Sequence, residues 1–404
     1  MPTTKAAVEL LAEPLTLRCG AVLPHRLAKS ALSEQLGDRR NRPGQELVEL
    51  YRTWSRGGAG MLVTGNVMVD PAALGEPRNV AVPARPDPAV FREWAAASAG
   101  TEAQLWVQLN HPGRQSPRFL SRQPVAPSAV PFDDRGVRSV FATPRALTGA
   151  EIEAIIDRFA LSARTVLEAG FRGIQLHGAH GYLISQFLSP LTNRRTDAWG
   201  GDAVRRRRFL LELVRRVRAE IGATAALSVK LNSADFQRGG FTEEESLEVV
   251  RELGEAGIDL LEISGGTYER AAMMGLTSET RSSTRNREAY FLDYATKARQ
   301  ISDVALMVTG GFRTVEGMGA ALRSGALDVI GLGRPVTVTP RPARAAARRG
   351  GRRGRATVPE DRYPAGRQLA GDPVAHPADA SRRLRQAGGP PPRCRPLARR
   401  RGGQ

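Results

Sequence analysis

Two imidazoles and a phenol lie within six residues of this chain, at His177, His180 and Tyr182. They follow a short apolar run that predicts a β-strand, and the glycines between them indicate a turn. Imidazole groups can hydrogen-bond a substrate oxygen, and a phenol can deliver a proton. The cluster therefore indicates a catalytic site in which His177 and His180 bind the substrate and Tyr182 donates the proton.

Two other interpretations of this cluster stay open. A histidine pair could bind a metal ion, but the sequence offers no plain third ligand and lacks the glutamate of a zinc-protease helix. The histidines could also serve only to satisfy backbone carbonyls of the turn. We favour the substrate-binding role and predict no metal site.

Gln108 and Lys230 close two other predicted strands. The Gln108 amide can donate and accept hydrogen bonds, and Lys230 supplies a fixed positive charge. Together they could recognise a flat heterocycle that carries both donors and acceptors.

Glycine-bearing turns follow the last two predicted strands, with Gly310 and Gly311 in the first and Gly333 and Arg334 in the second. Bare backbone amides and one guanidinium suit a phosphate dianion. A phosphate site next to a heterocycle site predicts flavin mononucleotide (FMN) as the cofactor.

Short β-type runs alternate along the chain with longer helical patterns, and these elements must position the residues named above. Eight strands are predicted, at Leu27–Ser30, Met61–Thr64, Gln104–Leu109, Gly173–Leu176, Leu227–Leu231, Leu260–Ile263, Leu306–Thr309 and Val329–Leu332. Seven helices are predicted, at 43–57, 86–99, 149–169, 203–221, 242–256, 289–301 and 314–324, with entry signals such as Thr148 before Glu151 and Thr242 before Glu245.

This count predicts an α/β fold, a (β/α)8 TIM barrel, in which active-site residues follow the carboxyl ends of the strands. A β-hairpin around Leu15–Leu23 is expected to plug the bottom of the barrel. An open, doubly wound sheet is the structural alternative.

Charge divides the chain into a barrel domain, residues 1–335, and a tail, residues 336–404. Of the formal charge of +18, the tail carries +13, from 17 arginines and four acidic residues, which leaves +5 for the barrel. With ten prolines, nine glycines and seven large aliphatic residues, the tail cannot bury enough surface to fold. We favour out-of-frame translation of a GC-rich gene as its origin; a plain disordered tail and a nucleic-acid-binding arm are the alternatives.

Two cysteines, Cys19 and Cys394, argue against a disulfide framework, a cysteine-rich zinc site and a four-cysteine iron–sulfur cluster. The N-terminal residues do not have the pattern of a signal peptide, and no apolar run approaches about 18 residues. We therefore expect a cytoplasmic protein without a membrane partner.

Longer motifs of the chain resemble those of the Old Yellow Enzyme family. Members of this family are FMN-dependent ene-reductases of the NADH:flavin oxidoreductase type. The resemblance covers about residues 15–335, and the segments that carry it are 26–31, 108–115, 177–182, 186–197, 200–201, 229–232, 287–292 and 331–334. It implies a single-barrel, FMN-only member, because the cysteines and second flavin domain of some relatives have no counterpart in the sequence.

The resemblance also implies a role for each matching residue. His177 and His180 would hydrogen-bond the carbonyl of an activated alkene, and Tyr182 would protonate its α-carbon. The Ser33 hydroxyl would lie near a flavin carbonyl, and Lys230 near flavin N1. The implied FMN-binding residues are Ala31, Leu32, Ser33, Gly65, Gln108, Lys230, Gly310, Gly311, Gly333 and Arg334.

The implied activity is reduction of activated C=C bonds in α,β-unsaturated carbonyl compounds, with NADPH or NADH as reductant. The segment Gly265–Glu288 is expected to set the small-molecule substrate. One alternative is an FMN barrel that dehydrogenates amines or alcohols; another is an inactive barrel whose basic tail binds polyanions. The tail replaces the family's last helix, so activity and assembly into a homo-oligomer stay open.

Overall fold

The computed structural model describes residues 4–264, 280–312, 314–333 and 335–338, all within the compact unit Met1–Arg362. Eight parallel strands form its central sheet, in the order in which they occur in the chain, and β3 pairs with both β4 and β13. The sheet therefore closes on itself, which confirms the TIM barrel. The strands are β3 (Leu27–Lys29), β4 (Met61–Met68), β6 (Gln104–Asn110), β9 (Gly173–Gly178), β10 (Ala226–Asn232), β11 (Leu260–Ser264), β12 (Ala305–Thr309) and β13 (Val329–Leu332), and β5 (Val80–Ala81) adds to β4.

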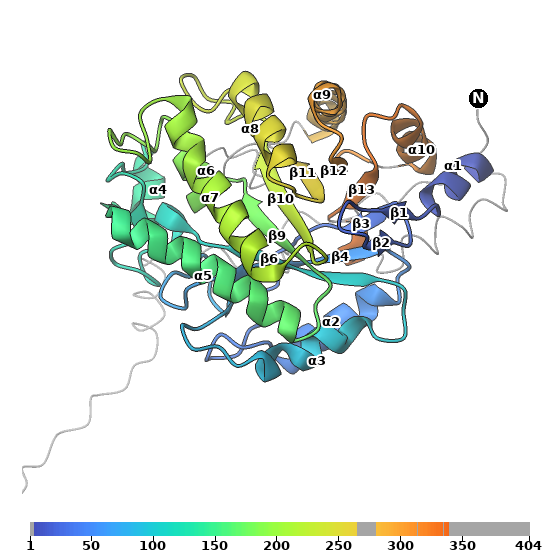
Figure 1. The fold of residues 1–404 in the computed structure, drawn as a ribbon, viewed down its shortest axis with the longest axis horizontal. Coiled ribbons are helices and arrows are strands. Elements are labelled where there is room, and N and C mark those ends of the chain that lie inside the picture. The colour runs from blue at the N-terminus through green and yellow to red at the C-terminus, as the bar shows by residue number, and fades with distance from the viewer. Residues whose placement is uncertain (1–3, 265–279, 313, 334, 339–404) are drawn as a thin grey trace, which may run out of the picture. The chain divides into compact units, whose positions relative to one another are not determined.

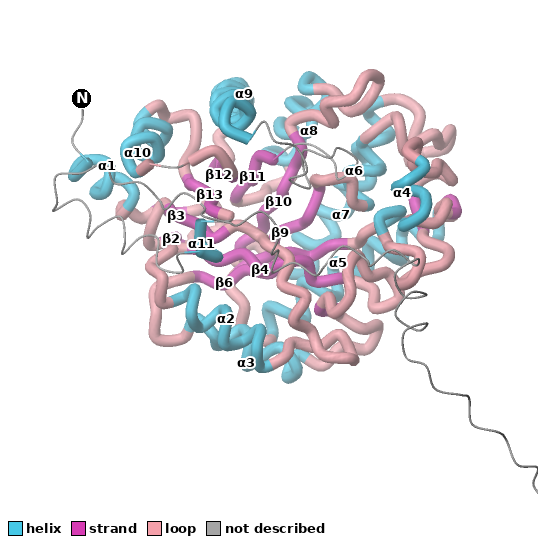
Figure 2. The backbone as a smooth tube through the Cα atoms, turned by 180° about the vertical axis from the view of Figure 1, so that it is seen from behind, coloured by secondary structure: helices cyan, strands magenta, loops and turns pink. Residues whose placement is uncertain are grey.

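Helices surround the barrel, as Figures 1 and 2 show. One helix from each interval between successive barrel strands corresponds to a predicted helix: α2 (Gln45–Ser55), α3 (Arg92–Ala95), α5 (Gly149–Glu168), α7 (Ala203–Ile221), α8 (Glu243–Glu255), α9 (Thr280–Ile301) and α10 (Val315–Arg323). The capping boxes at Thr148 and Thr242 are present as the sequence predicts. Each satisfies backbone N–H groups that a helix start leaves unpaired.

Two predicted helices differ from those observed. The helix predicted at 289–301 begins at Thr280, nine residues earlier, because residues 280–289 hold no large apolar side chain whose periodicity would reveal a helix. The helix predicted at 86–99 is a short α3 between two 3₁₀ turns, η1 (Pro88–Phe91) and η2 (Ala96–Ser98).

Four short helices were not predicted: α1 (Thr4–Leu11), α4 (Arg135–Val140), α6 (Leu183–Leu188) and α11 (Pro335–Val338). Helix α1 packs against α10, where Gly319 lets Ala7 approach closely. Helix α11 is attached to the barrel through Val336, which is buried and accepts a hydrogen bond from Trp54 Nε1 at 3.2 Å. The rest of the predicted tail lies outside the described residues.

Hydrophobic side chains form two separate cores. The larger lies between the strands and the helices, and the smaller lies inside the barrel around Trp106, Met61 and Leu260. Leu17 and Leu23, from the hairpin of β1 (Leu15–Thr16) and β2 (Val22–Leu23), belong to this inner core. The predicted hairpin is therefore confirmed, and it closes the amino-terminal end of the barrel.

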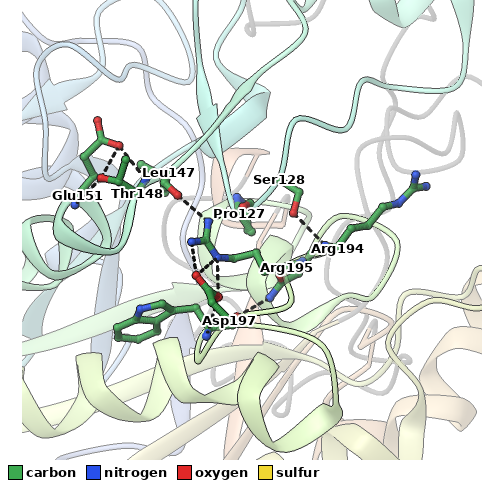
Figure 3. Close-up of polar contacts among 10 residues, drawn as sticks. Pro127, Ser128, Leu147, Thr148, Glu151, Arg194, Arg195 and Asp197 are labelled. Atoms are coloured by element: carbon green, nitrogen blue, oxygen red, sulfur yellow. Dashed lines mark hydrogen bonds and ion pairs between the residues drawn. The ribbon is translucent and has the colours of Figure 1, made fainter.

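The segment between β6 and α5 makes an excursion that contains α4 and a small sheet of β7 (Val125–Ala126) and β8 (Arg145–Ala146). Arg195 ties this excursion to the segment after α6 (Figure 3). Its guanidinium donates to the carbonyls of Pro127 and Leu147, at 2.9 and 2.6 Å, and forms an ion pair with Asp197. The Arg-rich motif after α6 thus has a structural role.

None of the described helices has both the length and the apolar character needed to cross a membrane.

Candidate active site

Strand register brings His177, Lys230 and Glu262 side by side at the carboxyl ends of three neighbouring strands. Lys230 on β10 lies opposite His177 on β9 and opposite Glu262 on β11. Residues paired in this way in a parallel sheet point to the same face, here the barrel interior. Lys230 Nζ lies 3.1 Å from Glu262 Oε1, with side-chain exposures of 5% and 0%.

The loop after β9 gathers His177, His180 and Tyr182, as the sequence predicts. The His177 ring lies 5.1 Å from the His180 ring and 4.8 Å from the Tyr182 ring, centroid to centroid, and is inclined by more than 70° to each. His180 adopts a left-handed backbone conformation, with φ of 60°, and Gly181 follows with φ of 76°. This tight turn places three side chains together before α6 begins.

Side chains from three further strands hold the cluster. The His180 ring shares a 2.7 Å hydrogen bond between Nε2 and Ser264 Oγ, and Asn232 Oδ1 accepts from the His180 backbone N–H at 3.2 Å. Asn66 Nδ2 donates to the Tyr182 hydroxyl at 3.4 Å. Strands β4, β10 and β11 therefore fix the orientation of residues that belong to one loop.

The surroundings of both histidines favour the neutral imidazole. Burial lowers the pKa of His177 and of His180 well below the ordinary value, and the charge of Lys230 lowers both further. His177 Nδ1 accepts from the Ala179 N–H at 3.2 Å, so the ring proton of the neutral imidazole is on Nε2. His177 is thus an uncharged hydrogen-bond donor beside a tyrosine.

Gln108 belongs to a hydrogen-bonded layer just below these histidines. Gln108 Nε2 donates to Gln175 Oε1 at 2.7 Å, and Gln175 Nε2 donates to Glu262 Oε2 at 2.8 Å. Lys230 joins the same layer through Glu262. Gln108 and Lys230, predicted separately from sequence, are therefore linked by two residues that the sequence analysis did not single out.

The turn after β12 has the backbone of an anion cradle. Gly310 and Gly311 both have positive φ, of 110° and 85°, and a Cβ placed on Gly310 would meet no atom of the described residues within 4 Å. Gly333, after β13, lies against Leu32, at 3.6 Å from a Cβ placed on it. Open space beside glycine amides, together with an ammonium and an amide inside the barrel, fits FMN. Arg334 lies outside the described residues.

Residues 31–34 follow β3 at the same end of the barrel. Ala31 packs against the inner core and Leu32 against the outer core. Ser33 is exposed, and its hydroxyl donates to Glu76. The structure thus places these three residues at the mouth of the barrel, where the sequence predicts a contact with the flavin.

Gly65 also lies at this end, but its N–H is already used. It donates to Glu34 Oε1 at 2.7 Å and to the Tyr51 hydroxyl at 3.2 Å. Tyr51 also accepts from the buried Lys29, whose pKa burial lowers to about 8. Gly65 is therefore part of a hydrogen-bonded group that holds residues 31–34 in place. The contact with the flavin that the sequence predicts for Gly65 would not use the Gly65 N–H, which is already bonded.

The sequence analysis missed Gln175, Glu262, Asn66, Asn232 and Ser264. A signal for two of them was present. Gln175 stands two residues before His177 on β9, and Glu262 stands two residues before Ser264 among the apolar residues of β11. Polar residues at a spacing of two mark the inner face of a barrel strand.

Among the described residues, no three His, Cys, Asp or Glu side chains gather where they could hold a metal ion. The histidine pair of the active site has no carboxylate or thiol as a third ligand in that part of the chain. The segment Gly265–Glu288, expected to set the substrate, has no described side chain.

The chain is similar to known proteins in both sequence and fold. The model of the NADH:flavin oxidoreductase / NADH oxidase family matches residues 10–349. An NADH-dependent flavin oxidoreductase from Hypocrea jecorina is 39% identical over 350 residues, covering 81% of this chain and 86% of the relative. Another, from a Neonectria species, is 37% identical over 81% of this chain, which spans only 46% of that relative. The structure of an old yellow enzyme homologue from Zymomonas mobilis superposes with a TM-score of 0.68 at 26% identity, covering 84% of this chain and 91% of that one.

Proposed function

Because the chain belongs to the NADH:flavin oxidoreductase / NADH oxidase family, we propose that it reduces the activated C=C bond of α,β-unsaturated carbonyl compounds. The resemblance to Old Yellow Enzyme is confirmed by the family match and by the similar solved structure. The chain is an oxidoreductase that uses FMN and NAD(P)H. The substrate and the roles of individual residues are the proposal.

FMN would be held at the carboxyl end of the barrel. The Gly310 and Gly311 turn would bind the phosphate, since both residues have positive φ and the space beside Gly310 is open. Lys230 and Gln108, which are buried in the barrel, would face the pyrimidine edge of the ring. When bound, FMN accepts hydride from NAD(P)H and supplies it to the alkene.

The single observation that carries this proposal is the mutual contact of His177, His180 and Tyr182 beside Lys230, which lies opposite His177 in strand register. Two neutral imidazoles can bind the substrate carbonyl and stabilise negative charge as it develops on that oxygen. Tyr182, buried beside His177, would give its proton to the α-carbon. Orientation by the two histidines would place the alkene for both transfers.

The proposal is tested with the purified full-length chain. We expect oxidised-flavin absorbance that bleaches on anaerobic addition of NADH or NADPH and returns on addition of 2-cyclohexen-1-one, with cyclohexanone as the product. Bleaching by an amine or an alcohol, without reoxidation by the enone, would favour dehydrogenation instead. A colourless protein that stays colourless with added FMN would overturn the proposal.

A second proposal concerns the boundary between the barrel and the tail. It is supported by the composition of residues 336–404. We propose that residues 1–335 form the FMN-binding barrel and that the Arg-rich tail takes no part in catalysis. Trypsin cleaves after arginine, so brief digestion of the full chain should yield a large fragment that keeps its flavin and its enone reductase activity. Loss of flavin in step with loss of the tail would contradict this.

A further inference from the structure

Glu262 is a fully buried carboxylate in the middle of a barrel strand, and the mechanism described above does not use it. It accepts from three donors: Lys230 Nζ at 3.1 Å, the Thr309 hydroxyl at 2.7 Å and Gln175 Nε2 at 2.8 Å. Burying a charge is costly unless it is paired and hydrogen-bonded. Such a group inside a barrel needs a reason beyond packing.

The contacts of Glu262 determine the orientation of two amides. An ionised carboxylate can only accept hydrogen bonds, so Gln175 must turn its NH₂ group towards Glu262. The Gln175 Oε1 atom then faces Gln108 and accepts from Gln108 Nε2 at 2.7 Å. Ser228 Oγ supports the same orientation by accepting from Gln175 Nε2 at 3.2 Å. Gln108 can then offer a ligand its carbonyl oxygen and the second N–H of its amide.

We propose that Glu262 is a positioning residue for FMN binding. It orients the Gln108 amide through Gln175 on one side, and it holds the Lys230 ammonium on the other. This inference rests on the proposed function, because it assumes that FMN is the ligand. On the first side, Glu262 fixes the Gln108 amide so that its carbonyl oxygen can accept from the N3–H of a flavin. On the second side, it fixes the Lys230 ammonium and offsets part of its charge.

The second effect bears on the reduction potential of the flavin. A cation near the pyrimidine edge stabilises the reduced, negatively charged ring, and a carboxylate at 3.1 Å from that cation weakens this effect. Removing the carboxylate charge should therefore favour reduced over oxidised FMN.

The test is Glu262→Gln in the full-length chain, with FMN affinity and midpoint potential as readouts. Glutamine keeps the volume but replaces one acceptor oxygen with an NH₂ group and removes the charge, so it cannot accept from all three donors and the orientation of the amides is no longer fixed. We expect at least a tenfold weaker affinity for oxidised FMN. We also expect the preference for reduced over oxidised flavin to rise about tenfold, which corresponds to about +30 mV for a two-electron couple.

Asp259→Asn is the matched control. Asp259 is a buried carboxylate just before the same strand, paired with Arg218 at 2.7 Å at the opposite end of the barrel. The Asp259→Asn variant should be less stable than the wild-type protein, and the midpoint potential of its bound FMN should be unchanged. An equal shift in both variants would mean that Glu262 acts only through general stability, which overturns the inference.

Two further variants keep the inference testable if Glu262→Gln does not fold. Glu262→Asp restores the charge and should keep the wild-type potential. Gln175→Leu leaves the Lys230–Glu262 pair and should weaken FMN binding with a much smaller change in potential. If every Glu262 and Gln175 variant that folds keeps the FMN affinity and midpoint potential of the wild-type protein, this inference alone is overturned. If the wild-type chain does not bind FMN, the proposed function is overturned.

Discussion

The His177 ring stands at 76° to the Tyr182 ring, with centroids 4.8 Å apart. This contact joins the end of β9 to the residue that precedes α6. It puts a neutral hydrogen-bond donor and a phenol at one point of the barrel mouth. Loss of either side chain should affect different steps of the reaction.

Tyr182→Phe removes the proposed proton donor and keeps the ring. Reduction of the flavin by NADH should be unchanged, while reoxidation by an enone should slow by about 10²- to 10⁴-fold, the usual contribution of a general acid. Stopped-flow measurement of the two half-reactions separates these effects. Tyr294→Phe, which removes a buried hydroxyl bonded to Ser246 outside the barrel, serves as control and should leave both rates intact.

His177→Ala removes a donor to the developing charge on the substrate oxygen. Turnover with an enone should fall by about 10²- to 10³-fold, as for loss of one donor in an oxyanion hole. FMN content should stay near that of the wild-type protein, because His177 is not among the proposed flavin-binding residues. Flavin absorbance of the purified variant, together with steady-state kinetics, checks both parts; a variant that loses FMN as well would place His177 in the cofactor site.

Protonation of His111 should weaken the fold in acid. Burial lowers the pKa of His111 to about 4, whereas an unfolded histidine has a pKa of about 6.5. Between these values the unfolded chain binds the extra proton. The free energy of unfolding should therefore fall as the pH drops from 6.5 to 4, by up to about 1.4 kcal/mol per pH unit from this group.

Urea unfolding at several pH values compares the wild-type chain with His111→Asn. Asparagine can keep the bond that His111 Nδ1 accepts from Gly113 N–H. The variant should lose stability less steeply in acid. Equal slopes for the two proteins would show that His111 does not contribute.

Gly173→Ala should overfill the inner core. A Cβ at Gly173 would lie 2.5 Å from Trp106 Cδ2, inside a closed barrel where the indole has little room to move. We expect a loss of about 1–3 kcal/mol in the free energy of unfolding, as for other overpacked cores. Gly149→Ala at the start of α5, where the nearest atom is 4.0 Å away, is the control and should be neutral or slightly stabilising.

Arg195→Ala should release the excursion that contains α4. The variant loses two bonds to backbone carbonyls and the ion pair with Asp197, so we expect about 2 kcal/mol of local stability to be lost. Limited proteolysis should then cut between residues 117 and 148 much faster than in the wild-type chain. Arg194→Ala is matched to it, since the Arg194 side chain is exposed and points away from these contacts (Figure 3); its cleavage rate should not change.

The sequence by itself determined the eight strands, the closing hairpin and the loop that gathers His177, His180 and Tyr182. These features depend on local patterns: apolar runs broken by glycine, the capping pairs at Thr148 and Thr242, and the cluster from His177 to Tyr182. Each can be read within a window of a few residues. The roles of the site residues follow from the family resemblance and stay predictions.

Only the tertiary structure decided which polar residues act together. Gln108 and Gln175, 67 positions apart, bond directly because the register of β6 and β9 pairs them. Gln175 and Glu262, 87 positions apart on β9 and β11, bond inside the barrel across the intervening β10. Likewise, the N–H of Gly65 on β4 bonds to Glu34 from the loop after β3. Register across a closed barrel is set by the packing of all its strands, so no local pattern in the sequence contains it.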